Sequence, residues 1–583
     1  MPDRNRRSST TGDGSQRART TRSRTSTPAV PTQAASDARI KFIFLLLAIF
    51  AIMVVGRLVY LSLIVGPSNS AKAEQTRTQT VTESAKRGTI YDRNGIVLAS
   101  DIEAISVYCN PHEVTDAQSE AKSIAAALGG AADDYIDSLT MEDTTFAYLY
   151  RKADKDAAAK LKEQGLDGVY FLEDTKRVYP YGQTAGQIVG MCDVDGNGLT
   201  GLELYYDDIL SGKDGTLVSE RGANGYPIAG GLKEEEAAVN GQDIVLSIDV
   251  EVQEYLEARL SQCVSDLSGK SGNAILYDGA TGEIVACASL PYLDPSNRTD
   301  VKEGSTELKP ITWSFEPGSI FKTVSMSAVL ESGVMGTEDT LYCPAALPAD
   351  EYYITDEKTR SDETMTLRQI MARSSNVGMS LAAKKLGFGP LYEAIERYNL
   401  TTKTGVDYPG ESSGYCDDQS NWTTVRSYNV SFGQGILVSP LQITRFYGSI
   451  ANDGVECTPH FLLSKPQSSE SVSYSTEQVF QNTAAIEPLT SIMQSVVSEG
   501  TGTGAQITGF SPAGKTGTAE YVGEDGEYIS GMNNISFVGF LPNTTSELVC
   551  FVGVTEVPGD NITTPAFKDI MTFAINHYGI TSE

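Results

Sequence analysis

The heptapeptide EPGSIFK, residues 316–322, opens an apolar segment that continues to Gly333. Because proline and glycine interrupt the chain ahead of it, we expect Ser319 to begin a buried helix. Positions three residues apart lie on one face of a helix, so Lys322 is predicted to reach the Ser319 hydroxyl. A serine needs a base to act as a nucleophile, and a lysine that burial keeps neutral supplies one. The backbone N–H of Ser319 would lie in the first helical turn, free to bind an oxyanion.

The pattern S-x-x-K is common, and a serine near a helix N-terminus beside a surface lysine has the same sequence. Apolar residues at positions 324, 326, 329 and 330 favour a buried helix over that alternative. We therefore interpret Ser319 as a candidate nucleophile and Lys322 as its base.

A second polar element, Ser374-Ser375-Asn376, lies within residues 366–386, which have the pattern of one continuous helix. The Ser374 hydroxyl and the Asn376 carboxamide can relay a proton and orient a substrate amide. The alternative is an ordinary polar turn of a helix. A similar tripeptide at residues 427–429 shows how easily S-x-N arises.

A third element, Lys515-Thr516-Gly517-Thr518, precedes a strand-like run at residues 535–540. Lys515 offers a cation for a substrate carboxylate, and Gly517 lets a substrate backbone approach closely. The Thr518 N–H is expected to complete an oxyanion hole, and its hydroxyl to bind the carboxylate. The lookalike K-T-G at residues 403–405 lacks the second threonine.

The composition excludes several other kinds of site. The 583 residues are too many for one core and suggest two to four domains. Only three histidines occur, which weakens a histidine relay or a multi-histidine metal site. None of the eight cysteines forms a C-x-x-C pair, so zinc and redox motifs are not expected. The cysteines are either disulfide partners of an exported domain or, more often, small buried hydrophobes.

The charge is unevenly distributed along the chain. Of 45 Lys and Arg and 75 Asp and Glu, residues 1–41 contain nine basic and three acidic side chains. The remainder is strongly acidic and would repel phosphate backbones, so nucleic acid is not an expected partner. Residues 1–41 contain few apolar groups, and we expect a disordered basic tail.

Residues 42–65 form an apolar run with a single charge, Arg57. At ~1.5 Å per residue, such a helix crosses a hydrocarbon core ~30 Å thick. A cleaved signal peptide is the alternative, but the run is longer than the usual ~7–15 residues of a signal core. We therefore expect a retained single-pass anchor in the cell membrane. The positive-inside rule predicts a cytoplasmic tail and an extracytoplasmic remainder.

Two exported modules follow, and together they predict an α+β protein. The first, at residues 66–232, begins with a polar linker and mixes short strands with alanine-rich helices. The second, at residues 241–583, has strand-like runs near both ends and a largely helical middle. Strands at both ends with helices between them indicate an antiparallel sheet covered by helices.

The order S-x-x-K, S-S-N, K-T-G resembles the signature of serine β-lactamases and penicillin-binding proteins, whose middle element can be S-D-N. The chain as a whole looks like a class B penicillin-binding protein. Further blocks that resemble this family are RGTIYDRNG at 87–95, RVYP at 177–180, GLTGLE at 198–203, TGEIVA at 281–286 and SFGQG at 431–435.

The resemblance implies a single transmembrane helix, an extended pedestal ("dimerisation") domain and a β-lactamase-like transpeptidase domain. It implies a peptidoglycan D,D-transpeptidase that β-lactams inhibit. Ser319 would attack the D-Ala–D-Ala bond of a stem peptide with Lys322 as base. By the same analogy Ser374 and Asn376 assist proton transfer, and Lys515 and Thr518 hold the terminal carboxylate. No metal or organic cofactor is implied. Expected partners are stem peptides, β-lactams, the membrane, a membrane-embedded glycan polymerase and division proteins.

Two residues depart from the family pattern and bear on substrate or drug preference. Ile320 stands where threonine is usual, and Glu520 stands where glutamine is usual. The blocks look more like the division or spore type than the elongation type. The alternatives are a β-lactamase, for which no deacylating base is evident, and a β-lactam-binding sensor or scaffold, which would show a broken motif or a cytoplasmic signalling module.

Overall fold

The computed structural model describes residues 33–66, 68, 78–220, 233–522, 528–559 and 561–582. The chain divides into two compact units, residues 1–80 with 218–234, and residues 81–217 with 235–583. Three strands cross the boundaries between these units: β1 (Thr78–Glu83), β6 (Gly215–Glu220) and β7 (Lys233–Glu236).

The first unit contains the apolar helix. Helix α1 spans Gln33–Val59 and continues as a π-helical turn over Tyr60–Val65. Residues 39–65 are long and apolar enough to cross a membrane, as expected. The helix begins nine residues before the predicted span, because residues 33–41 contain alanine, glutamine and arginine, which favour helix. The predicted disorder therefore does not hold for residues 33–41, and the rest of that prediction, at 1–32, lies outside the described residues.

Two large sheets lie in the described part of the second unit. A five-stranded sheet runs in the order β10-β9-β20-β19-β18, and every neighbouring pair is antiparallel. This arrangement agrees with the predicted antiparallel sheet and the α+β class. The strand bounds are β9 Ser271–Asp278, β10 Ile284–Ser289, β18 Ala513–Val522, β19 Tyr528–Phe540 and β20 Leu548–Pro558.

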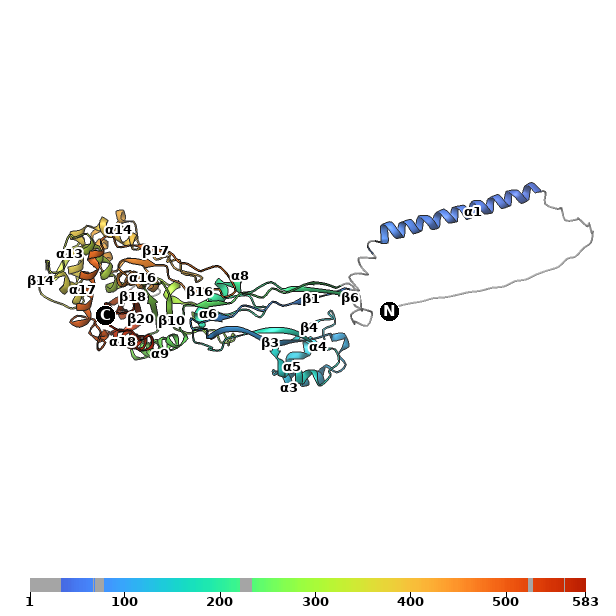
Figure 1. The fold of residues 1–583 in the computed structure, drawn as a ribbon, viewed down its shortest axis with the longest axis horizontal. Coiled ribbons are helices and arrows are strands. Elements are labelled where there is room, and N and C mark those ends of the chain that lie inside the picture. The colour runs from blue at the N-terminus through green and yellow to red at the C-terminus, as the bar shows by residue number, and fades with distance from the viewer. Residues whose placement is uncertain are drawn as a thin grey trace, which may run out of the picture. The chain divides into compact units, whose positions relative to one another are not determined.

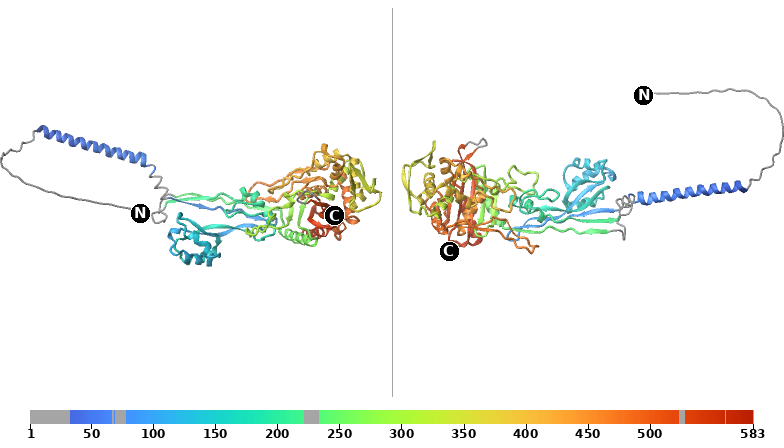
Figure 2. Two further views of the ribbon diagram at one scale, coloured as in Figure 1. Left: turned by 180° about the vertical axis from the view of Figure 1, so that it is seen from behind. Right: turned by 90° about the horizontal axis from the view of Figure 1, so that it is seen from above.

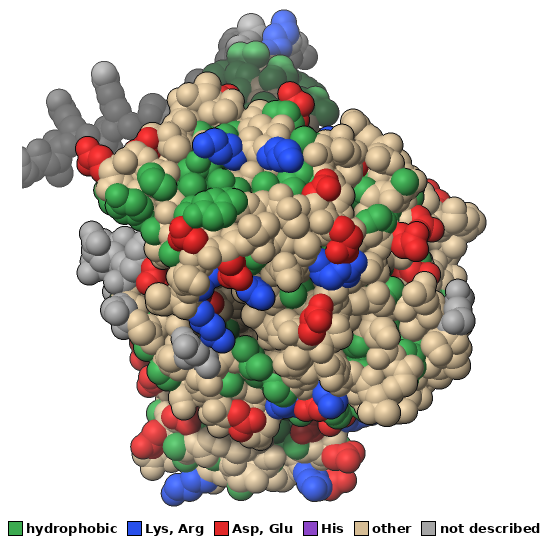
Figure 3. Space-filling model, turned by 90° about the vertical axis from the view of Figure 1, so that its left-hand side faces the viewer, with side chains coloured by type: hydrophobic (Ala, Val, Ile, Leu, Met, Phe, Trp, Pro, Cys, Tyr) green, Lys and Arg blue, Asp and Glu red, His purple; other side chains and the backbone are tan. Residues whose placement is uncertain are grey.

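Helices cover both faces of this sheet (Figure 1), which explains why residues of β9 and β10 are buried almost without alternation. On one face lie α9 (Val250–Asp266) and α18 (Thr564–Tyr578), which contact each other and the strands. Asp249 caps α9, as predicted, by accepting hydrogen bonds from the N–H groups of Glu251 and Val252. Figure 3 shows an end of the molecule on which acidic and basic side chains are interspersed.

The opposite face of the sheet carries the larger helical layer that holds the predicted site. Its helices are α10 Lys309–Thr312, α11 Lys322–Glu331, α12 Leu367–Ala372, α13 Asn376–Leu386, α14 Phe388–Arg397, α15 Thr424–Ser431, α16 Pro440–Ala451 and α17 Ile486–Ser498. Three small two-stranded antiparallel sheets accompany these helices: β11 Thr340–Cys343 with β14 Glu363–Thr366, β12 Ala346–Ala349 with β13 Tyr352–Thr355, and β15 Val455–Cys457 with β17 Thr476–Gln478.

The second sheet joins the two predicted modules. Its order is β16-β8-β2-β3-β4, and β5 also pairs with β3. Strands β2 (Ile90–Tyr91), β3 (Val97–Cys109), β4 (Ala147–Asp154) and β5 (Val169–Val178) come from the first module. Strands β8 (Ile244–Leu246) and β16 (Leu462–Ser464) come from the second. The predicted boundary between residues 232 and 241 therefore separates the modules in sequence, but their strands share one sheet.

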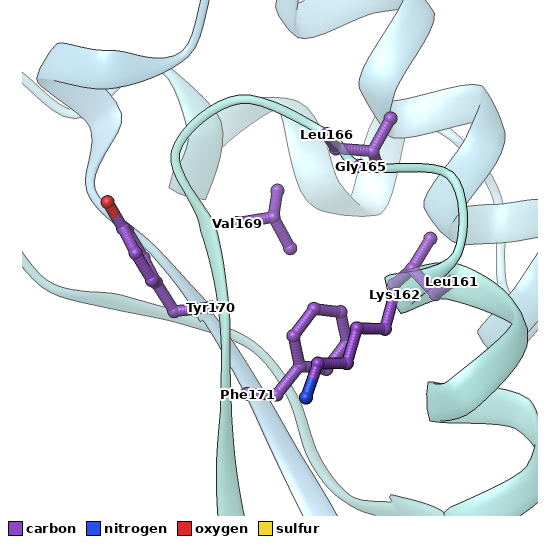
Figure 4. A pocket seen from close by; sticks show the side chains of 7 residues that line it. All are labelled: Leu161, Lys162, Gly165, Leu166, Val169, Tyr170 and Phe171. Carbon is purple, nitrogen blue, oxygen red and sulfur yellow. The ribbon is translucent and has the colours of Figure 1, made fainter.

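The far end of this sheet carries a small helical layer (Figure 2). Helices α3 (Ala117–Leu128), α4 (Asp133–Leu139) and α5 (Lys155–Lys162) pack on β3 and β4 around their own apolar cluster. A pocket of about 340 Å³ opens here (Figure 4), lined by Leu161, Lys162, Gly165, Leu166, Val169, Tyr170 and Phe171. Most of these lining residues are apolar, and none of them is a predicted catalytic residue.

A buried charge cluster connects the three family-like blocks of the first module. Glu203, in α7 (Gly201–Tyr205), accepts hydrogen bonds from Arg87 Nε at 2.6 Å and from Arg177 Nε at 2.7 Å. Asp207, the first residue of α8 (Asp207–Leu210), accepts one from Arg87. Asp101 also pairs with Arg177. The short helix α6 (Gly186–Val189) follows the RVYP block.

All eight cysteines are free thiols, and seven are buried. They therefore act as small apolar residues, which was the more frequent of the two expected alternatives.

Candidate active site

Ser319 lies in a 3₁₀ turn, Gly318–Phe321, and α11 begins only at Lys322. This differs from the prediction that Ser319 itself begins the α-helix. This turn still brings the Ser319 and Lys322 side chains together, because residues three apart eclipse each other in a 3₁₀ turn. Lys322 Nζ lies 2.8 Å from Ser319 Oγ. The predicted pair is thus in hydrogen-bond contact.

The turn depends on Gly318, whose φ of +53° lies in the left-handed region. A Cβ at this position would lie 2.6 Å from the carbonyl oxygen of Thr518. The Gly318 N–H donates to the carbonyl oxygen of Gly433 at 3.0 Å. Gly433 of the SFGQG block therefore holds the turn that contains Ser319 by a backbone hydrogen bond, and β18 packs against Gly318 of the same turn.

Lys322 is completely buried and has four oxygen neighbours. Besides Ser319 Oγ, its Nζ lies 2.7 Å from the Ser374 carbonyl oxygen, 3.1 Å from Ser374 Oγ and 2.7 Å from Asn376 Oδ1. The carbonyl and carboxamide oxygens can only accept hydrogen bonds, whereas the two hydroxyls can also donate. A neutral amine can therefore donate to both of these acceptors and accept the hydrogen bond of Ser319.

The electrostatics favour that neutral form. Burial without a directly bound carboxylate lowers the pKa of Lys322 to about 7, although the nearby charges of Asp356 and Glu357 act to raise it. A large fraction of Lys322 is thus uncharged near neutral pH, as a general base must be.

Ser374 and Asn376 do not lie in a continuous helix, contrary to the prediction for residues 366–386. Helix α12 ends at Ala372, and α13 begins at Asn376. Between them Ser374 has a φ of +57°, which is unusual for a serine. Ser375 then caps α13 by accepting from the Gly378 N–H. The break turns the Ser374 carbonyl and hydroxyl toward Lys322, which an unbroken helix would prevent.

The K-T-G-T element lies on β18, the edge strand of the five-stranded sheet. Lys515 Nζ is 2.9 Å from Ser374 Oγ and 3.0 Å from the Thr516 carbonyl oxygen. Burial and the nearby Lys322 charge place the pKa of Lys515 well below its ordinary value. The structure therefore brings Lys515 into the same hydrogen-bond network as the other predicted residues.

Gly517 and Thr518 sit where β18 crosses the nucleophile turn. A Cβ at Gly517 would lie 2.4 Å from Ser536 Oγ and 3.0 Å from Ile320 Cγ2, so the close packing requires glycine. Thr518 is partly buried. Ile320, one of the two departures from the family pattern, is fully buried beneath β18, whereas Glu520, the other, is exposed.

The lookalike sequences have other contacts. Thr404, in the second K-T-G, donates its N–H and its hydroxyl to Glu411. Ser427 lies inside α15 and donates to the Thr423 carbonyl oxygen.

Sequence reasoning missed three residues that contact the predicted motifs. Thr501 Oγ1 lies 2.7 Å from Thr516 Oγ1. Asp356 and Thr355 bind the segment that contains Asn376. These residues follow no motif, and their chain positions carry no signal that could have identified them.

Comparisons with known proteins identify the family of the chain. Residues 272–572 match the family described as penicillin binding protein transpeptidase domain, and residues 82–246 match the penicillin-binding protein dimerisation domain. A probable peptidoglycan D,D-transpeptidase, PbpC, from Pseudomonas aeruginosa is 30% identical over 554 residues, covering 92% of this chain and 94% of that protein. The peptidoglycan D,D-transpeptidase FtsI of Escherichia coli is 30% identical over 485 residues, covering 82% and 80%.

A solved structure is similar over the same length. The crystal structure of penicillin binding protein 3 from Mycobacterium tuberculosis, complexed with aztreonam, has a TM-score of 0.68 to this chain at 25% identity. The match covers 86% of this chain and 98% of that one.

Proposed function

We propose that this chain, which belongs to the class B penicillin-binding proteins and is a serine-type peptidoglycan D,D-transpeptidase, cross-links stem peptides through an acyl-enzyme on Ser319. The observation that carries the assignment of Ser319 is its 2.8 Å contact with the buried amine of Lys322. A hydroxyl beside an amine with a pKa of about 7 is an activated nucleophile at neutral pH.

Acylation begins when Ser319 Oγ attacks the carbonyl carbon of the D-Ala–D-Ala bond and its proton passes to Lys322. The C–N bond then breaks, and the departing nitrogen of D-alanine receives that proton by way of the Ser374 hydroxyl, which is within reach of both lysines. An ester on Ser319 remains. The backbone N–H groups of Ser319 and Thr518 would stabilise the oxyanion formed on the way.

Deacylation completes the cross-link. The amine of a neighbouring stem attacks the ester carbonyl and loses a proton to Lys322, and Ser319 Oγ regains a proton as the new amide forms. Asn376 would orient the substrate amide, and Lys515, with Thr516 and Thr518, would hold the terminal carboxylate. A β-lactam would undergo only the acylation step and remain as an ester on Ser319, because its leaving nitrogen stays attached to the acyl group.

We propose a single-pass membrane protein, because the described residues contain one helix, at residues 39–65, that is long and apolar enough to cross a membrane. We propose a cytoplasmic tail and an extracytoplasmic transpeptidase, since the basic residues 1–41 precede the helix. We also propose residues 66–232 and 241–583 as pedestal and transpeptidase domains. A membrane-embedded glycan polymerase and division proteins are the proposed partners, in septal or spore wall synthesis.

Fluorescent penicillin tests the assignment directly. The full-length protein in detergent should be labelled, and Ser319→Ala should lose the label because the ester cannot form. Ser427→Ala is the matched control, since that serine occupies a lookalike motif inside α15. Labelling that survives Ser319→Ala would show that another residue is acylated.

A further inference from the structure

The end of the β12–β13 hairpin makes hydrogen bonds to the loop between α12 and α13 and to the start of α13. The Thr355 carbonyl oxygen accepts a hydrogen bond from Asn376 Nδ2 at 3.0 Å. The next residue, Asp356, accepts one from Ser375 Oγ at 2.8 Å and one from the Val377 N–H at 2.9 Å. Two consecutive residues thus bind three consecutive residues of the loop.

Asp356 is itself well fixed. Its carboxylate pairs with Arg360 Nε at 2.6 Å, and the two side chains are only 11% and 15% exposed. The carboxylate binds Ser375 directly after Ser374, the residue in the left-handed conformation. A backbone in that region persists only where neighbouring contacts determine it. Asp356 provides such contacts through Ser375 and Val377.

We propose that Asp356 is a positioning residue of the acyl-transfer reaction, holding Ser374 and Asn376 around the Lys322 amine through Ser375 and Val377. The inference rests on the function proposed above. Asp356 makes no hydrogen bond to Ser319 or Lys322 among those found in residues 233–522, so its effect passes through the loop. Where related motifs read S-D-N, a carboxylate stands in the loop itself, whereas here a serine in that place binds a carboxylate from the hairpin.

A purely structural role is the alternative, because Asp356 also neutralises the N-terminus of α13. The two roles differ in their effect on Lys322. The charged groups that face its amine are Lys515 from β18, and Asp356 and Glu357 from the hairpin, with Arg360 beside them. The Asp356 charge favours the protonated amine, so its loss should lower the pKa of Lys322. The acidic side of the pH–rate profile of acylation should then move to lower pH.

The test measures the second-order rate constant of acylation by fluorescent penicillin against pH, together with the melting temperature, for full-length protein in detergent. Asp356→Asn keeps an oxygen acceptor but loses the charge. We expect its rate at neutral pH to fall at least about tenfold, because small misplacements of catalytic groups are costly. The acidic side of its pH–rate profile should move to lower pH, because the Asp356 charge raises the pKa of Lys322. Ser375→Ala, which removes the link but keeps the carboxylate, should lower the rate with a smaller shift.

Asp362→Asn is the matched control, since that carboxylate binds Tyr342 and the Ala345 N–H in the same region without contacting the loop. It should keep the wild-type rate and profile. The proposal is overturned if Asp356→Asn keeps the wild-type rate, or if it lowers the melting temperature while the pH midpoint stays in place. Absence of any Ser319-dependent labelling in the wild type would instead refute the proposed function.

Discussion

Lys322 and Lys515 approach the same hydroxyl, with their Nζ atoms 3.1 Å and 2.9 Å from Ser374 Oγ. Both lysines are completely buried. Two ammonium groups this close repel each other, so the pair does not hold its full set of protons near neutral pH. A substrate carboxylate beside Lys515 would draw the proton to that amine and leave Lys322 neutral. Substrate binding would thereby prepare the base.

The first prediction concerns the pH dependence of acylation. The rate should rise with pH through about 7, because Lys322 must be neutral to accept the Ser319 proton and its pKa is lowered to that value by burial. Stopped-flow acylation with a β-lactam that does not titrate in this range measures the profile. Lys403→Ala, in the lookalike K-T-G, should leave it unchanged. A rate that rises only near the free-lysine pKa of ~10.4 would contradict the depressed pKa.

The second prediction separates activity from stability at Ser374. Replacement by glycine removes the hydroxyl that both lysines contact, so acylation should fall by about 10²-fold. The same change relieves the left-handed backbone, whose φ is +57°, and the melting temperature should stay constant or rise.

Ser374→Ala is the comparison for that experiment, because alanine loses the hydroxyl but keeps the strained backbone. It should lose as much activity and be less stable than the glycine variant. Equal melting temperatures for the two variants would show that the backbone conformation is not strained.

The sequence was sufficient to predict which residues meet at the candidate site because the motifs are local. Ser319 and Lys322 lie three residues apart, and any helical turn brings them together. The antiparallel sheet was also predictable, since β9, β10, β19 and β20 are apolar runs bounded by turn residues.

The features that the sequence did not predict depend on contacts between residues that are far apart in the chain. The apolar pattern of residues 366–386 runs through the break at Ser374, so periodicity alone predicts one helix. Ser-Ser-Asn is a capping sequence, and it was the one local signal of a new helix start. Asp356 and Thr501 reach the site only through tertiary packing, and β8 and β16 join the pedestal strands across long stretches of chain.

The third prediction concerns the buried charge cluster of the pedestal. Glu203→Ala leaves Arg87 and Arg177 without their central partner, and an unpaired buried charge typically costs about 3–5 kcal/mol. The melting temperature should fall clearly, while acylation of the protein that remains folded should be unchanged. Glu103→Ala is the control, since its pair with Lys155 is exposed and contributes little. A small effect of Glu203→Ala would show that the arginines find new partners.

The last prediction concerns Glu257, a carboxyl of α9 at the junction with the pedestal. Its Oε1 accepts hydrogen bonds from the Ala185 N–H at 3.0 Å and from Gln253 Nε2 at 2.7 Å. Burial raises its pKa to about 7 from an ordinary value of 4.5. A carboxyl with a raised folded-state pKa stabilises the protein fully below pH 4.5, and this contribution is lost as pH rises toward 7.

Glu257→Gln should remove this dependence, because the carboxamide oxygen can accept both hydrogen bonds without ionising. The variant should match the wild type at acidic pH and exceed its free energy of unfolding by about 3 kcal/mol above pH 7. Melting temperatures of both proteins across this range measure the difference, and Asp266→Asn, at an exposed carboxyl of α9, is the control. A constant difference at every pH would show that Glu257 ionises normally in the folded protein.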